Sequence, residues 1–215
     1  MRTRPSRSTG SRMNRFVDFQ RIAGGLLTGL AVLLTSTALA RQSTATTSWL
    51  DRPLTNWNHA ERLPAAASAA GEDPDALRAR CAITRGESAA HRALEENGWM
   101  PYHHLDRELT RGDVEILAGM TAADAACQPT HFQIFVFVQG RFAGTLSPQP
   151  MTAGRDGFAG AVRIIEADTI SSEFARFREG DASCCPTSRM TVRFRIDRAG
   201  EQALLVPVDV RTTRG

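Results

Sequence analysis

The residues with the clearest chemical potential are four cysteines, Cys81, Cys127, Cys184 and Cys185. An even number of cysteines in an exported chain predicts disulfide bonds, and four cysteines allow three pairings. A bond between Cys184 and Cys185 would close a strained eight-membered ring across Cα atoms only about 3.8 Å apart. We therefore expect Cys81 and Cys127 each to bond to one member of the adjacent pair. Loops of some 58 to 104 residues would then each stabilise the fold by roughly 4 to 5 kcal/mol.

The same adjacent pair has a second interpretation, as a thiol–disulfide exchange site formed by Cys184-Cys185-Pro186. The run lacks the Cys-x-x-Cys spacing that places a thiol at a helix N-terminus and lowers its pKa. A structural role is the preferred interpretation, and redox exchange is the alternative.

No metal or cofactor site is expected. His103-His104 lies beside Tyr102 and Asp106, but neighbouring side chains of an extended segment point to opposite faces. Neither Cys-x-x-Cys nor His-Glu-x-x-His occurs in the sequence. The nucleophile motifs Gly-x-Ser-x-Gly and Ser-x-x-Lys are also missing, so the sequence assigns no catalytic residue.

One loop is a candidate binding surface. The run at 140–157 (GRFAGTLSPQPMTAGRDG) begins as a strand and continues as a Pro/Gly-rich loop of about ten residues, a length typical of functional or mobile loops. Its candidate binding residues are Ser147, Met151, Arg155 and Asp156. The expected partner is an unknown envelope protein or a small ligand. The alternative is a plain Asp156-Gly157 turn beside a surface arginine.

The periodicity of the chain predicts an α+β fold, mostly antiparallel sheet with one or two short helices. Apolar residues recur at helical spacing over 88–97, and Asn97-Gly98 is a plausible helix end. The stretch 170–177 fits either state, and we expect a helix there because Ile170, Phe174 and Phe177 share one helical face.

Strand signals fill most of the remainder. Alternation over 114–120 predicts a half-buried strand, and the run 131–138 (HFQIFVFV), apolar on both faces, predicts a central strand. Gln139-Gly140 would turn the chain into an antiparallel partner at 141–146. Further strands are expected at 162–165, 189–196 and 204–210, the last two as a hairpin through Ala199-Gly200.

The N-terminus has the pattern of an export signal. Six arginines and a single acid precede the uncharged run at 22–34. The run is followed by Ala38-Leu39-Ala40, a small-x-small cleavage site. We expect Sec-type export, cleavage after Ala40 and a periplasmic or secreted product that starts at Arg41. The alternatives are an uncleaved anchor, which would be the only membrane contact, and translation from Met13.

Cleavage would reverse the sign of the net charge. The chain has 26 basic residues, all arginine, and 23 acids. Six of these arginines and one acid lie in residues 1–40, so 20 arginines and 22 acids remain, a net charge of −2 with His neutral. No nucleic-acid partner is therefore expected from the basic pI.

The mature chain is long enough for one domain. We expect a tether with a docking segment around Trp49 and Trp57 over 41–76, a single α+β domain over 77–210 and a short tail at 211–215. The Ala-rich part of 63–75 reads as a loosely ordered connection.

Several short runs together resemble the LppP/LprE family of bacterial cell-envelope lipoproteins. The runs are 135–138 (FVFV), 140–148 (GRFAGTLSP), 155–157 (RDG), 173–177 (EFARF), Asp181 and 184–186 (CCP), and the likeness extends over about 77–207. The resemblance implies envelope location and paired cysteines but no reaction. The chain departs from the family at the export signal, because Arg41 stands where a lipoprotein needs its lipid-bearing cysteine.

The functional expectation is an uncharacterised exported envelope protein, a non-catalytic binding or structural module. The alternative is an envelope enzyme, either a thiol–disulfide exchanger or a hydrolase whose residues gather only in the folded chain.

Overall fold

The structure is a computed structural model, and it describes residues 48–59, 62–67, 73–102, 109–182 and 184–214. All of them belong to one compact unit, Ala45–Gly215. The expected signal at 1–40, its cleavage site and the His103-His104 pair lie outside the described residues. No helix in the described part of the chain is long and apolar enough to cross a bilayer.

The first sheet is antiparallel and has β4 near its centre, as predicted for the run at 131–138. Its order is β1-β3-β4-β5, with β2 also paired to β3 and β6 also paired to β4. The strands are β1 (Met100–Tyr102), β2 (Leu109–Arg111), β3 (Val114–Ala123), β4 (Pro129–Val138), β5 (Arg141–Thr145) and β6 (Met151–Thr152). Gln139 and Gly140 both have positive φ, 53° and 72°, so the expected tight turn joins β4 to β5.

The second sheet is an antiparallel meander in the order β10-β9-β8-β7. Its strands are β7 (Ala159–Glu166), β8 (Thr169–Arg176), β9 (Ser188–Asp197) and β10 (Leu204–Arg214). The predicted hairpin of the last two strands is confirmed.

The helix expected at 170–177 is wrong, because this stretch is β8. Ile170, Ser172 and Phe174 point into the core, while Ser171 and Glu173 between them are only partly buried. That alternation is the period of a strand. Pairing on both sides, with β7 and β9, outweighs the helical spacing of the three apolar residues.

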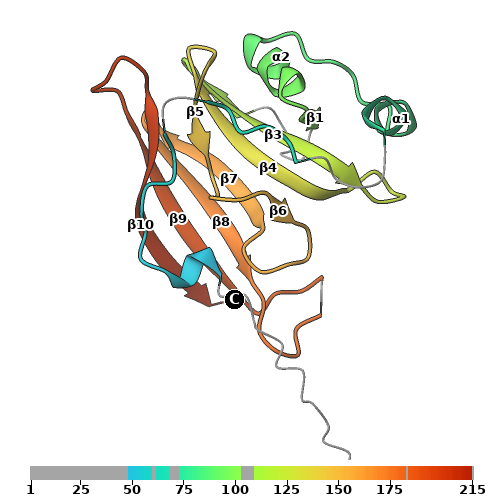
Figure 1. The fold of residues 1–215 in the computed structure, drawn as a ribbon. Helices are drawn as coiled ribbons and strands as arrows, with labels where there is room; N and C mark the ends of the chain where they lie inside the picture. The colour runs from blue at the N-terminus through green and yellow to red at the C-terminus, as the bar shows by residue number, and fades with distance from the viewer. Residues whose placement is uncertain (1–47, 60–61, 68–72, 103–108, 183, 215) are drawn as a thin grey trace, which may run out of the picture. The chain divides into compact units, whose positions relative to one another are not determined.

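Two hydrophobic clusters explain why β4 is apolar on both faces. Ile134 and Val136 belong to the main cluster, which also contains Phe174 and Phe194 of the second sheet. Phe135 and Phe137 belong to a second cluster with Leu94 of helix α2. Figure 1 shows α2 on the side of the first sheet turned away from β7 to β10. The strand at 114–120 is likewise buried on both faces rather than half-buried.

Helix α2 (Ala89–Glu96) confirms the prediction at 88–97. Ser88 is its N-cap, with Oγ accepting the backbone N–H of His91, and Gly98 follows with φ 81°. Helix α1 (Pro74–Arg80) was not expected, although Asp73-Pro74 is a typical helix start. Asp73 accepts the backbone N–H groups of Asp75 and Ala76, and Leu77 is buried in the main cluster.

Hydrogen bonds attach the N-terminal segment, residues 48–58, to both sheets. It contains a short 3-10 helix, η1 (Trp49–Asp51), followed by an extended run to Asn58. Trp57 donates to the carbonyl of Thr145 on β5, and Asn58 donates to Thr145 and to the carbonyl of Leu205 on β10. The segment therefore bridges one edge strand of each sheet.

Candidate functional site

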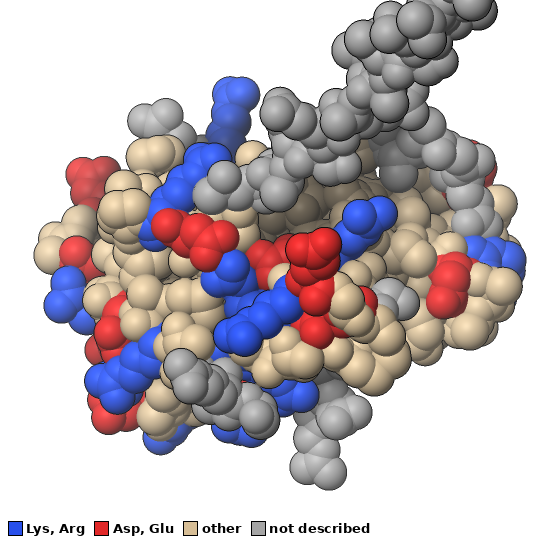
Figure 2. Space-filling model, turned by 90° about the horizontal axis from the view of Figure 1, so that it is seen from below, with Lys and Arg blue, Asp and Glu red and all other residues tan. Residues whose placement is uncertain are grey.

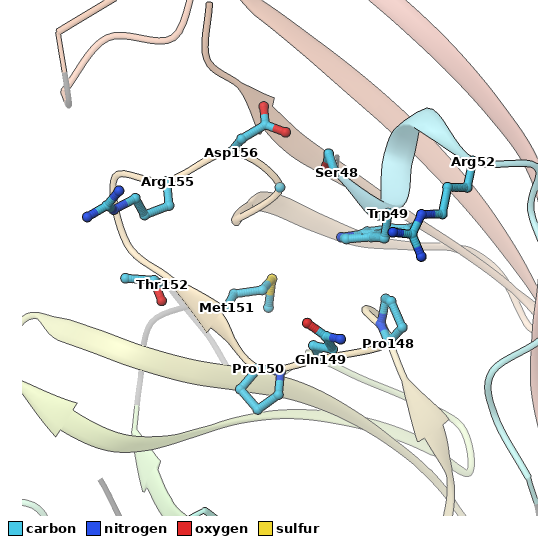
Figure 3. Close-up of a pocket in the computed structure, with 11 residues that line it drawn as sticks. Ser48, Trp49, Arg52, Pro148, Gln149, Pro150, Met151, Thr152, Arg155 and Asp156 are labelled. Carbon is cyan, nitrogen blue, oxygen red and sulfur yellow. The ribbon is translucent and has the colours of Figure 1, made fainter. Parts of the chain in front are cut away.

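A pocket of about 350 Å³ lies between η1 and the loop after β5 (Figure 3). Its lining residues are Ser48, Trp49, Arg52, Pro148, Gln149, Pro150, Met151, Thr152, Arg155, Asp156 and Gly157. Three of the four candidate loop residues, Met151, Arg155 and Asp156, are in this lining. The volume is at the lower end of the range for small-ligand sites.

Ser147, the fourth candidate, is fully buried behind the loop. Its Oγ lies 2.9 Å from Gln133 Oε1 and 2.8 Å from the carbonyl oxygen of Gln149, and these two acceptors share its one proton. Gln133 donates in return to the carbonyl of Ser147 at 3.1 Å. Ser147 thus fixes the start of the pocket loop on β4 and does not face the pocket.

The apolar walls come from two distant parts of the sequence. Figure 3 shows the Trp49 ring and the Met151 side chain directed toward the same space, with Gln149 also pointing into it. Trp49 packs edge-on against Trp57 and Phe174, at centroid distances of 5.2 and 5.1 Å. These contacts hold the indole as a rigid wall.

Gly157 allows the loop to approach Trp49. Its φ is 83°, and a Cβ at this position would lie 3.2 Å from Trp49 Nε1. Only glycine combines that backbone conformation with so close an approach. The sequence marked Asp156-Gly157 as a turn but gave no sign of its indole neighbour.

The two acids near the pocket, Asp51 and Asp156, share one arginine on β8, Arg176. Arg176 contacts Asp51 through Nη2 at 2.7 Å and Asp156 through Nε at 2.9 Å. Burial opposes the charge of Arg176, but its hydrogen bonds to Asp51 and Asp156 prevail and raise its pKa. Asp156 also accepts the backbone N–H of Phe177 at 2.9 Å.

The two arginines of the pocket lining differ from Arg176 in having no acidic partner among the described residues. Arg52 and Arg155 are exposed, and neither forms an ion pair with any other described residue. Elsewhere on the surface, the face in Figure 2 has arginines interspersed with Asp and Glu rather than a continuous basic patch. The pocket lining therefore contains two arginines that form no ion pair with a described acid.

The cysteine pairing expected from the sequence is wrong. Cys81 bonds to Cys127, with Cα atoms 5.5 Å apart, and Cys184 bonds to Cys185. Cys81 is the C-cap of α1, and Arg80 donates to the carbonyl of Asp124 at 2.9 Å, which holds the end of α1 over the β3–β4 connection. The tertiary structure thus brings these two distant cysteines together, and the adjacent pair is left to bond internally despite its small ring.

A serine, a histidine and a carboxylate meet at the start of α2, a set that the sequence did not mark because Glu115 lies on β3. Ser88 Oγ is 2.8 Å from His91 Nδ1 and donates to Glu115 Oε1 at 2.9 Å. In a nucleophilic triad, the serine and the carboxylate bond opposite nitrogens of the imidazole. Here Ser88 Oγ and Glu115 Oε1 both approach the same nitrogen, Nδ1, at 2.8 and 3.6 Å, and Ser88 caps the helix. The set therefore anchors α2 on the first sheet.

Within the described ranges, no three His, Cys, Asp or Glu side chains are grouped as metal ligands would be. His131 and His91 lie on separate elements, β4 and α2. The pocket and the exposed Cys184–Cys185 disulfide are two features of the described residues with potential for function.

The fold and the pocket together define a disulfide-bonded two-sheet α+β protein with a small ligand-sized site. Residues 106–199 match the model of the LppP/LprE lipoprotein family, which confirms the resemblance read from the sequence. The matched region contains the whole pocket loop, 148–157, and the Cys184-Cys185 pair, and its lipoprotein character agrees with an exported envelope protein. No curated protein and no solved structure matches the chain.

Proposed function

We propose that this envelope protein is a non-catalytic binding module whose pocket between η1 and the 148–157 loop takes a small amphiphile with an anionic head group. One observation carries the proposal: the apolar walls made by Trp49 and Met151 adjoin the guanidinium of Arg52, which has no ion-pair partner among the described residues.

The charges around the pocket favour an anion over a cation. Asp51 and Asp156 are already bound by Arg176, so neither carboxylate is available as the sole partner of a cationic ligand. Arg52 and Arg155 remain for an anionic group. A guanidinium group binds a carboxylate or phosphate through two parallel hydrogen bonds. In Figure 3, Arg155 extends away from the pocket centre, so Arg52 is the principal contact.

The walls favour an apolar body next to that head group. Met151 is 4% exposed and packs on the main core, and Pro148 and Pro150 have no backbone N–H to satisfy. The lining contains no histidine, cysteine or lysine, and its one carboxylate, Asp156, is paired with Arg176. Recognition without chemistry is the function that this set of residues supports.

The test is a fluorescence titration of the mature protein with 8-anilinonaphthalene-1-sulfonate, an aromatic body with one anionic group. The Arg52→Ala variant should weaken binding by about tenfold or more, the usual effect of losing a charged hydrogen bond. Arg193→Ala is the matched control, since Arg193 is exposed on β9 and does not line the pocket.

Competition then identifies the head group. Octyl phosphate or octanoate should displace the probe, and the neutral octyl glucoside should not. Equal weakening by Arg52→Ala and Arg193→Ala, or displacement by the neutral compound alone, would contradict the proposal.

A further inference from the structure

Two disulfides of very different character lie in the described part of the chain. Cys81–Cys127 joins residues 46 positions apart, and both cysteines are partly buried. Cys184–Cys185 joins neighbours, and both are exposed. A cross-link between adjacent residues closes almost no loop of the unfolded chain, so it adds little to global stability.

We propose that Cys184–Cys185 is a thiol–disulfide exchange site, which accepts two electrons from an exposed dithiol of a partner molecule, while Cys81–Cys127 is structural. The proposal is independent of the ligand pocket.

The loop that carries the pair is closed by bonds that do not involve sulfur. Asp181 accepts the backbone N–H of Arg178 at 2.8 Å, and it accepts both the N–H and the hydroxyl of Thr187 at 3.0 Å. These bonds join the two ends of the 178–187 loop. The sulfur bond can therefore open and close while the loop remains attached to β8 and β9.

The contacts of the cysteines themselves are few. The backbone N–H of Cys185 donates to the carbonyl of Ala182 at 2.9 Å, and neither cysteine belongs to a hydrophobic cluster. Both sulfurs are therefore accessible to an incoming thiolate without displacement of core side chains. By contrast, Cys81 packs against the main core cluster.

The exchange balances as follows. A thiolate of the donor attacks one Sγ, the bond between the two protein sulfurs breaks, and its electron pair leaves on the neighbouring Sγ, which takes a proton from water. The second donor thiol, after losing its proton, attacks the donor sulfur of the mixed disulfide and releases the first cysteine as a thiolate, which also takes a proton from water. The protein gains two electrons and two protons, and the donor becomes a disulfide.

Because the two cysteines are adjacent, oxidation of the reduced pair should re-form the internal disulfide. When one cysteine of the reduced pair is oxidised to a mixed disulfide, its neighbour is the nearest thiol and can displace the adduct. The pair should therefore return to an internal disulfide rather than accumulate two adducts.

The first test is selective reduction of the native mature protein with dithiothreitol, followed by alkylation and peptide mapping. Cys184 and Cys185 should be alkylated at least about tenfold faster than Cys81 and Cys127, because exchange rates follow access to the sulfur. Equal rates, or faster alkylation of Cys81 and Cys127, would overturn the assignment.

The second test follows closure of the pair with 5,5′-dithiobis(2-nitrobenzoate) by absorbance and intact mass. The selectively reduced wild type should release two thionitrobenzoate ions and end with no adduct. Cys185→Ser should release one and retain one adduct, and Cys184→Ser should do the same. A wild type that retains two adducts would show that the neighbours do not exchange, and the proposal would be wrong.

Discussion

Asn58 occupies the space into which a side chain at Gly144 would project: a Cβ built on Gly144 would lie 2.5 Å from Asn58 Cγ. The Asn58 amide accepts the backbone N–H of Thr145 at 2.8 Å and donates to the carbonyls of Thr145 and Leu205 at 3.1 and 3.0 Å. A glycine on β5 thus lets one asparagine of the N-terminal segment join the edges of both sheets.

Gly144→Ala should displace Asn58 and lower the free energy of unfolding by about 2 to 4 kcal/mol, because buried polar groups lose their partners in addition to the backbone strain at φ 154°. Urea unfolding measures the change. Gly112→Ala is the control, since Gly112 also has positive φ but nothing within 4 Å of its Cβ position. If the two variants lose equal stability, Asn58 does not depend on Gly144.

Gly157→Ala should move Trp49 and weaken binding of the sulfonate probe, because the added methyl group would lie 3.2 Å from the indole nitrogen. Gly180→Ala separates this effect from backbone strain, since its φ is 92° and its Cβ position is open. We expect Gly180→Ala to bind the probe like the wild type. Unchanged probe affinity in Gly157→Ala would show that Trp49 is not a wall of the binding site.

Replacing both Cys81 and Cys127 by serine should lower the free energy of unfolding by about 4 kcal/mol, the chain-entropy value for a loop of this length. Replacing both Cys184 and Cys185 should cost about 1 kcal/mol or less by the same relation. Thermal and urea unfolding of the two double variants compare the bonds directly. The reverse order of stability would contradict the structural role of Cys81–Cys127.

The wild type should lose more unfolding free energy on acidification than the Asp181→Asn variant. Backbone hydrogen bonds from Arg178 and Thr187 lower the pKa of Asp181 in the folded state, below the value of about 3.9 in an unfolded chain. The stabilisation is therefore complete above the unfolded pKa and is lost as the pH falls through the folded pKa. The stability difference between wild type and variant, measured in urea, should be largest near pH 7 and shrink toward pH 3.

Glu179→Gln is the control for this pH dependence, because Glu179 is exposed in the same loop and its replacement by glutamine removes the same charge. Its difference from the wild type should change little with pH. A difference for Asp181→Asn that grows toward acid would be incompatible with a lowered pKa.

Local signals predicted most of the strands correctly, because their information lies between neighbours in the chain. Alternation marked β3, the Gln139-Gly140 turn marked the β4–β5 hairpin, and Ser88 with Gly98 marked the two ends of α2. The apolar run on β4 predicted a central position, which both of its buried faces explain.

The errors arise where neighbours in space decide. The stretch at 170–177 has apolar residues at a spacing that suits a helix, yet pairing with β7 and β9 makes it a strand. The expected disulfide pairing was wrong because the spacing of the cysteines indicates the strain of a small ring but not that the end of α1 places Cys81 beside Cys127.

The candidate site shows the same division. A long Pro/Gly-rich loop with Met151, Arg155 and Asp156 was visible in the sequence, because loop length and composition are local properties. Three features of the site depend on contacts over as many as 125 positions: Trp49 forms the opposite wall, Arg176 pairs with both Asp51 and Asp156, and Ser147 turns inward. The sequence by itself determined the family likeness and most of the strands, and it predicts export. Only the tertiary structure decided which cysteines bond and which charges remain unpaired, because both follow from distances between segments that the chain order does not specify.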